Sequence, residues 1–289
     1  MATLSTPQTP AHPQFEAPAP LRLWHLTSLD APTVAVLWTL AFAWSAHLRL
    51  PPWLPAVIGL AAWSFYIADR LLDARAACSP LRPRHHFHWR HRRVFLPLAV
   101  LAGAAALALV LRYMPLAART RNTAIAAAAM LYFTSVHVPQ RAWQRIRRIP
   151  HPPKELIVGL LFTVVCALPT WTRMETTRAS LLLPALIFIA LAWLNCHAIE
   201  VWESASPLQR TSIASTAATL AAAALISAAI ATTHWPRTAA LLGTAAISAI
   251  LLLILDRQRD RQRHRLAPTT LRAAADLVLL APALLLFVR

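Results

Sequence analysis

The chain has 289 residues, of which 57% are hydrophobic and only 13% are charged, and its mean hydropathy is +0.50. A soluble domain of this length would be far more polar, so the composition excludes an ordinary globular protein and indicates a membrane protein. The formal net charge of +17 does not indicate nucleic-acid binding, because basic loops of a membrane protein are held at anionic lipid. The three cysteines lack CxxC spacing and indicate neither a disulfide framework nor a zinc site.

The N-terminal segment differs from the rest of the chain. Residues 1–20 are rich in Pro, Thr and Ala, and we expect them to form a disordered tail. They do not form a secretory signal, because no apolar stretch with a small-residue cleavage site follows the start. Residues 21–289 are predicted to form one transmembrane domain.

Apolar segments recur along that domain, with Pro and Trp residues at the joins between them. Each is near the 20 residues that a helix needs to cross about 30 Å of hydrocarbon. Gly is scarce, with four residues in the chain, so close helix packing is expected to rely on Ala. The segments predict an all-α polytopic transmembrane bundle of about nine helices, at residues 31–48, 54–72, 94–111, 122–138, 155–171, 181–202, 211–231, 238–255 and 271–288.

Lys and Arg are concentrated in alternate loops. The loops at 70–93, 139–154 and 256–270 hold most of them, and the loops on the other side hold few. The positive-inside rule therefore predicts a cytoplasmic N-terminus and, with nine spans, a C-terminus outside. We expect an integral protein of the bacterial inner membrane.

Two pairs of acids lie at the ends of spans that run toward the cytoplasm. Asp69 and Asp73 end the second span, in the stretch FYIADRLLD, and Glu200 and Glu203 end the sixth. Spacings of three and four residues place each pair on one helix face, and both pairs fall at the same depth. Facing carboxylate pairs of this kind favour Mg²⁺, which binds through a few carboxylates and substrate phosphates. In the alternative interpretation, Asp69 and Asp73 pair with Arg70, Arg75 or the Arg-rich loop that follows.

Several short segments, spread over nearly the whole chain, resemble the motifs of one known family. Together they resemble the UbiA superfamily of intramembrane prenyltransferases, whose first Asp-rich motif resembles FYIADRLLD and whose second belongs where Glu200 to Glu203 lie. The other matching pieces are Leu29 to Pro32 followed by Leu37-Trp38, Tyr132 with Pro153 to Gly159 and Phe162, and Asp276 with Pro282.

The resemblance implies a UbiA-like bundle and a Mg²⁺-dependent transfer reaction. A prenyl diphosphate would be held through Mg²⁺ by Asp69, Asp73, Glu200 and Glu203, and its prenyl group would pass to a lipophilic acceptor, aromatic or lipid. Metal and cationic side chains would neutralise the diphosphate so that it can leave. The partners expected are therefore the prenyl diphosphate, the acceptor and the lipid bilayer.

Basic residues near the acids are the candidate partners of the phosphates. They are Arg70, Arg82, Arg84 and Lys154. Lys154 has an equal alternative, which is a local pair with Glu155.

The chain departs from the family pattern at specific positions. Phe65 and Tyr66 stand where the family usually has Asn and Asp, and Glu replaces Asp in the second motif. Tyr66 lies at a depth where its ring could stabilise an allylic cation, and Asn195 is a candidate additional oxygen ligand. The departures leave open a non-catalytic UbiA-like scaffold or lipid-binding protein. A transporter with the acids as an ion relay is disfavoured, because no inverted repeat is evident and the acids lie near one face.

The segment LRPRHHFHWRHRR, residues 81–93, leaves three interpretations open. Following the resemblance, it is a basic cap over the diphosphate. It could instead bind a metal or haem through His85, His86, His88 and His91, although adjacent His residues rarely converge without a defined scaffold. The third interpretation is a basic loop that touches anionic lipid.

Overall fold

The computed structural model describes residues 16–76, 82–137, 154–175, 178–203, 212–261 and 267–287, and within these ranges it holds helices and no strand. The all-α prediction is confirmed at this level. The helices are α1 (Ala19–Leu26), α2 (Asp30–Ser45), α3 (Trp53–Ala76), α4 (Pro83–Arg90), α5 (Arg92–Tyr113), α6 (Leu116–His137), α8 (Lys154–Trp171), α9 (Ala179–Glu203), α10 (Ser212–Ala231), α11 (Pro236–Arg261) and α12 (Pro268–Val278), followed by the 3₁₀ helix η2 (Ala281–Phe287).

Among the described residues, seven helices are long and apolar enough to cross a membrane. They overlap seven of the nine predicted spans. Helices of this length and composition are typical of a membrane protein. Six are α3, α5, α8, α9, α10 and α11, and the seventh runs through α12 into η2, over Pro268–Leu285.

The predicted span at 31–48 takes a different form. Its helix α2 has 16 residues and is too short to cross alone, because a helix rises 1.5 Å per residue. The helix α1 precedes it at an angle of 88°, and the two together would make an eighth span. Ser28, at the bend, has a φ of 56°, and Pro32 lies in the first turn of α2, where its missing N–H costs nothing.

The predicted span at 122–138 falls on α6 as far as His137, where the described residues end, and α6 is not among the seven apolar helices. Its first turns carry Arg119, Arg121 and Asn122, which lower the hydropathy of that end. The predicted orientation depends on nine spans, so the sides of the membrane on which the termini lie stay predictions.

The disordered tail predicted for residues 1–20 is wrong at its C-terminal end. Ala17 is buried, and its N–H donates to Oγ1 of Thr270 at 2.9 Å. The helix α1 begins at Ala19, with Pro20 in its first turn, where the fixed φ of proline favours helix. Residues 1–15 lie outside the described part of the chain.

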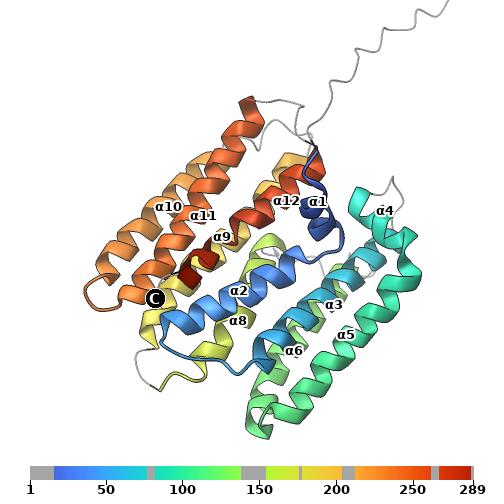
Figure 1. Ribbon diagram of the computed structural model, residues 1–289, viewed down its shortest axis with the longest axis horizontal. Helices are drawn as coiled ribbons and strands as arrows, with labels where there is room; N and C mark the ends of the chain where they lie inside the picture. The colour runs from blue at the N-terminus through green and yellow to red at the C-terminus, as the bar shows by residue number, and fades with distance from the viewer. Residues whose placement is uncertain are drawn as a thin grey trace, which may run out of the picture.

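The core lies where α2, α8, α9 and α11 meet. Figure 1 shows α10 and α11 at one edge of the bundle and α5 with α6 at the other. The rings of Trp38 and Phe188 stack with centroids 3.7 Å apart, and Trp38 Nε1 donates to the carbonyl of Leu279. A Cβ on Gly159 would meet the backbone nitrogen of Trp193 at 3.0 Å, so α8 and α9 approach closely at a glycine.

Several chain segments gather at one end of this bundle. They are α1, α4, the C-terminal turns of α3 and α9, and the N-terminal turns of α12 (Figure 1). The helix α4 contacts α1 and α3, and α12 contacts α1 and α9. Charged side chains that are far apart in the sequence therefore come together here.

Candidate functional site

The four predicted acids each face a basic or imidazole side chain. On α3, Asp69 accepts from Arg70 at 2.8 Å, and Asp73 Oδ2 lies 3.7 Å from Nε2 of His85. On α9, Glu200 lies 3.5 Å from the Nζ of Lys154. The pairing with a neighbouring arginine that the sequence left as an alternative is therefore present at Asp69, whereas the partner of Glu200 comes from another helix.

Glu203 is the most enclosed member of the four. Its side chain is 16% exposed, and it accepts hydrogen bonds from both Nε and Nη2 of Arg272 on α12. Arg82 Nη1 lies 2.7 Å from Oε2 of Glu203, the same oxygen that accepts from Arg272 Nη2. The three contacts, two from Arg272 and one from Arg82, occupy most of the lone pairs of this carboxylate.

These four carboxylates do not converge on one point in this arrangement. Among the described residues, no three of the four carboxylates each bring an oxygen within 4.8 Å of the others. Mg²⁺ demands near-octahedral oxygen ligands about 2.1 Å from the ion. The requirement for Mg²⁺ remains a prediction.

Three of the predicted phosphate partners do come together, and a fourth arginine joins them. Arg84 lies within electrostatic range of Arg70, Arg82, Asp69 and Glu203. Arg272 enters through its bonds to Glu203. We call Arg70, Arg82, Arg84 and Arg272 the arginine cluster. Lys154 does not join it in the described contacts, since its ion pairs are with Glu155 and Glu200 on α8 and α9.

Arg70 shows how the cluster is prepared for a ligand. Its side chain is 11% exposed, and its guanidinium lies 5.5 Å from the centroid of the Tyr66 ring. One terminal nitrogen donates to Asp69, while Nε is buried without a hydrogen-bond partner among the described residues. A buried donor without an acceptor is costly, and an anion in the cluster would satisfy it.

The α4 helix supplies a second sign of excess positive charge. Burial, and then the neighbouring Arg70, lower the pKa of the Arg84 guanidinium to about 9. Burial and the charge of Arg84 lower the pKa of His85 to about 3, so His85 is neutral. Its Nε2 accepts from Arg84 Nε at 3.2 Å. Burial is the larger cause of both shifts, and the neighbouring cations add to it.

The histidines of residues 81–93 do not form a metal-binding group in the described structure. His88 is fully buried, donates from Nδ1 to the carbonyl of Arg84 and packs against Phe95. His91 bonds the carbonyl of Phe87 at the surface, and His86 is exposed. The histidines therefore act mainly in holding α4 to α5.

A groove with a volume of about 480 Å³ lies among the ends of α3, α4 and α5. Arg92 stacks over the ring of Trp89 at 4.8 Å on its wall. Trp with Arg at helix ends is typical of the membrane–water interface. None of the predicted site residues lines the groove, whose walls are Leu71, Leu72, Arg75, Trp89, Arg92, Arg93 and Leu96.

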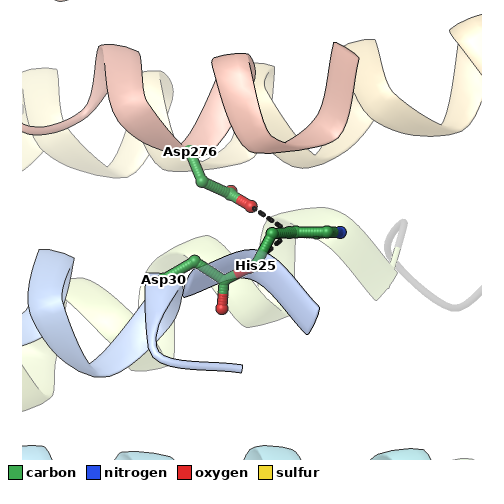
Figure 2. A group of neighbouring side chains, drawn as sticks. All are labelled: His25, Asp30 and Asp276. Atoms are coloured by element: carbon green, nitrogen blue, oxygen red, sulfur yellow. Dashed lines mark hydrogen bonds and ion pairs between the residues drawn. The ribbon is translucent and has the colours of Figure 1, made fainter. Parts of the chain in front are cut away.

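A second charged group was not predicted from the sequence. His25 of α1, Asp30 of α2 and Asp276 of α12 converge with their ligand atoms within 4.8 Å of one another (Figure 2). His25 Nδ1 lies 2.7 Å from Asp30 Oδ2 and 3.7 Å from Asp276 Oδ2. The other oxygen of Asp30 accepts the N–H of Ala31 at 2.9 Å. We call these three residues the acidic triad.

Asn195 contacts the acidic triad and does not contribute to the Glu200 pair. Its Nδ2 donates to Asp276 Oδ1 at 3.3 Å, and its Oδ1 is buried without a partner among the described residues. The sequence indicates Asp30 and Asp276 only as parts of short family-like segments, and it does not indicate His25. The signal available was a His five residues before an Asp, but only the bend after α1 makes the two side chains meet.

Comparison with known proteins gives no match: no family model matches the chain, and neither a curated protein nor a solved structure does.

Proposed function

We propose that the protein is a membrane-embedded prenyltransferase that binds a polyprenyl diphosphate at the arginine cluster and transfers its prenyl group to a lipophilic acceptor. The observation that carries the proposal is the charge of the cluster. Three guanidinium groups contact the carboxylates of Asp69 and Glu203, and that of Arg84 lies within electrostatic range of both, which leaves an excess of positive charge. Guanidinium groups bind phosphate oxygens in paired hydrogen bonds, so the excess suits a diphosphate.

The surroundings indicate an anion that carries an apolar chain. The cluster lies at one end of helices long and apolar enough to cross a membrane. A prenyl tail would extend between or along these helices, while the diphosphate stays at the polar end. In the predicted orientation, this end faces the cytoplasm of a bacterium.

The proposed reaction breaks the bond between the allylic carbon and the diphosphate oxygen. The electron pair leaves with the diphosphate, and the guanidinium groups stabilise the negative charge that develops there. The acceptor supplies the electron pair of the new bond and then loses a proton. The ring of Tyr66, which lies beside Arg70, would stabilise the allylic cation through its face.

A second candidate is a non-catalytic protein that binds anionic lipid through the same cluster. The pairing of the four acids favours it, because Glu203 is occupied by two arginines and Glu200 faces Lys154. A prenyltransferase without a carboxylate-bound metal must neutralise the diphosphate with arginines alone. The two candidates make different predictions for turnover and the same prediction for binding.

The first test is binding of geranylgeranyl diphosphate to the detergent-purified protein, with and without Mg²⁺. Arg70→Gln and Arg84→Gln should each weaken binding at least tenfold, whereas Arg90→Gln, at an exposed position of the same helix α4, should not. Geranylgeraniol, which lacks the diphosphate, should bind poorly. Equal binding by all variants would contradict the proposal.

The second test separates the enzyme from the lipid-binding protein. Membranes that contain the protein are supplied with radiolabelled geranylgeranyl diphosphate, and inorganic diphosphate and prenylated lipid are measured. Transfer that is lost in Arg84→Gln supports the prenyltransferase. Tight binding without release of inorganic diphosphate supports the non-catalytic alternative.

A further inference from the structure

We propose that the acidic triad of His25, Asp30 and Asp276 binds one divalent first-row transition-metal ion, of the class of Zn²⁺ or Mn²⁺. The site is separate from the arginine cluster, and the proposal does not depend on the proposed function. It rests on the geometry of the three side chains, on their burial and on the neighbouring Asn195.

The three donor atoms are already close to the spacing of metal ligands. Donors about 2.1 Å from a tetrahedral Zn²⁺ lie about 3.4 Å apart. His25 Nδ1 is 3.7 Å from Asp276 Oδ2 and 2.7 Å from Asp30 Oδ2, so only the second separation must open. Figure 2 shows the Nδ1 edge of the imidazole directed at the two carboxylates, with Nε2 directed away, so Nδ1 is the nitrogen available to a metal.

The charges of the triad call for a cation. His25 and Asp30 are 3% and 4% exposed. Among the described ion pairs, those of Asp30 and Asp276 involve only His25, so two carboxylates share one imidazole. A buried charge without compensation is costly. A divalent ion would compensate both carboxylates and leave the imidazole neutral.

Asn195 supplies an independent observation. Its side chain is buried, 3% exposed, and it contacts the triad through the Nδ2 bond to Asp276. Its Oδ1 has no hydrogen-bond partner among the described residues. Metal-binding carboxylates are commonly oriented by such a second hydrogen bond, and the amide oxygen is a further hard ligand.

The donor set distinguishes among metals. An imidazole with carboxylates suits Zn²⁺, Mn²⁺ or Co²⁺, whereas Mg²⁺ prefers an all-oxygen shell that retains several waters. The ligands come from α1, α2 and α12, so the ion would join both sides of the 88° bend to the last span.

The test is metal binding by the full-length protein in detergent, after treatment with a chelator. Co²⁺ is added as the spectroscopic probe, and Zn²⁺ is measured by equilibrium dialysis with elemental analysis. The wild type should bind one equivalent and give a visible Co²⁺ spectrum. His25→Ala and Asp276→Asn should each weaken binding about tenfold or more.

Two controls exclude other sites. The double variant His86→Ala/His91→Ala removes surface histidines of the α4 segment, and Asp73→Asn with Glu200→Gln removes two of the predicted Mg²⁺ ligands. Both should retain the ion. Loss of the ion in either control with retention in His25→Ala would overturn the proposal.

The nearly isosteric Asp276→Asn keeps the test valid if His25→Ala does not fold. A wild-type protein that binds less than a stoichiometric amount of Co²⁺ and Zn²⁺, or a variant Asp276→Asn that binds as the wild type does, would also overturn it. The triad would then be a structural ion pair between helix ends.

Discussion

The arginine cluster and the acidic triad lie at the same end of the bundle, but their charges are unbalanced in opposite directions. The cluster holds more cations than acids, and the triad holds two acids and one imidazole. The helix α12 contributes to both, because Arg272 and Asp276 are four residues apart, which is about one turn or 6 Å along the axis. Two adjacent sites with opposite imbalances suit two different ligands, an anion and a cation.

The largest expected effect comes from breaking the most enclosed ion pair. Glu203→Gln should lower the free energy of unfolding by about 3 kcal/mol, because Arg82 and Arg272 lose their shared carboxylate in a site where Arg272 is only 13% exposed. Thermal unfolding in detergent measures this. The same change increases the positive excess of the cluster, so affinity for geranylgeranyl diphosphate should not fall.

A matched control is Asp260→Asn, which removes the partner of Arg259 at 3.6 Å on a carboxylate that is 55% exposed. Its effect on stability should stay within about 0.5 kcal/mol. Loss of diphosphate binding in Glu203→Gln, at unchanged fold, would show that Glu203 binds the ligand through a metal as the sequence predicted.

Arg84→Gln should separate stability from binding. Arg84 has no ion pair among the described residues, and its pKa is already lowered by burial. Removal of this desolvated cation should therefore leave the unfolding temperature unchanged or raise it. Affinity for geranylgeranyl diphosphate should fall about tenfold, or about 1.4 kcal/mol. A variant that is both destabilised and unchanged in affinity would remove Arg84 from the proposed site.

Acid pH should lower the free energy of unfolding through the protonation of His88. Burial lowers the pKa of His88 below its ordinary value of 6.5, so the unfolded chain binds more protons below that pH. The stability that neutral His88 provides is therefore present above pH 6.5 and is lost as the pH falls through the lowered value, by at most about 1.4 kcal/mol per pH unit.

Unfolding temperatures between pH 7.5 and 5 measure this loss, and His88→Gln should reduce the slope because glutamine does not titrate. The fully buried ring packs against Phe95 and bonds the carbonyl of Arg84, so its protonation would release α4. Identical slopes in the variant and the wild type would assign the pH dependence to other groups.

Hydropathy predicted the presence of the apolar helices more accurately than the residues at which they begin and end. The span expected at 94–111 is α5, Arg92–Tyr113, with nearly the same limits. The span expected at 238–255 continues as helix to Arg261, because hydropathy marks the edge of the lipid and not the last hydrogen-bonded turn. The span expected at 31–48 is shorter than predicted, since no hydropathy profile reveals the 88° bend before α2.

The sequence predicts which charged residues share one helix face, but it does not predict their partners on other helices. The four-residue spacing correctly places Asp69 and Asp73 along one helix. The partners come from other elements: Glu203 bonds Arg272, which is 69 residues away in sequence, and Asn195 bonds Asp276, which is 81 residues away. Such contacts depend on how helices pack, and the periodicity of one helix does not contain that information.

The smallest expected effect is at Lys154, and it decides on which side of the α9 C-terminus the phosphates bind. Lys154 is 65% exposed, and its ion pairs with Glu155 and Glu200 are 3.7 and 3.5 Å long. Exposed pairs contribute about 1 kcal/mol or less, so Lys154→Gln should barely change the unfolding temperature. Its affinity for geranylgeranyl diphosphate should equal that of the wild type, because the arginine cluster does not include it. A tenfold loss in Lys154→Gln with wild-type affinity in Arg84→Gln would instead place the diphosphate between α8 and α9, beside Glu200, and the positive excess around Arg84 would then have another purpose.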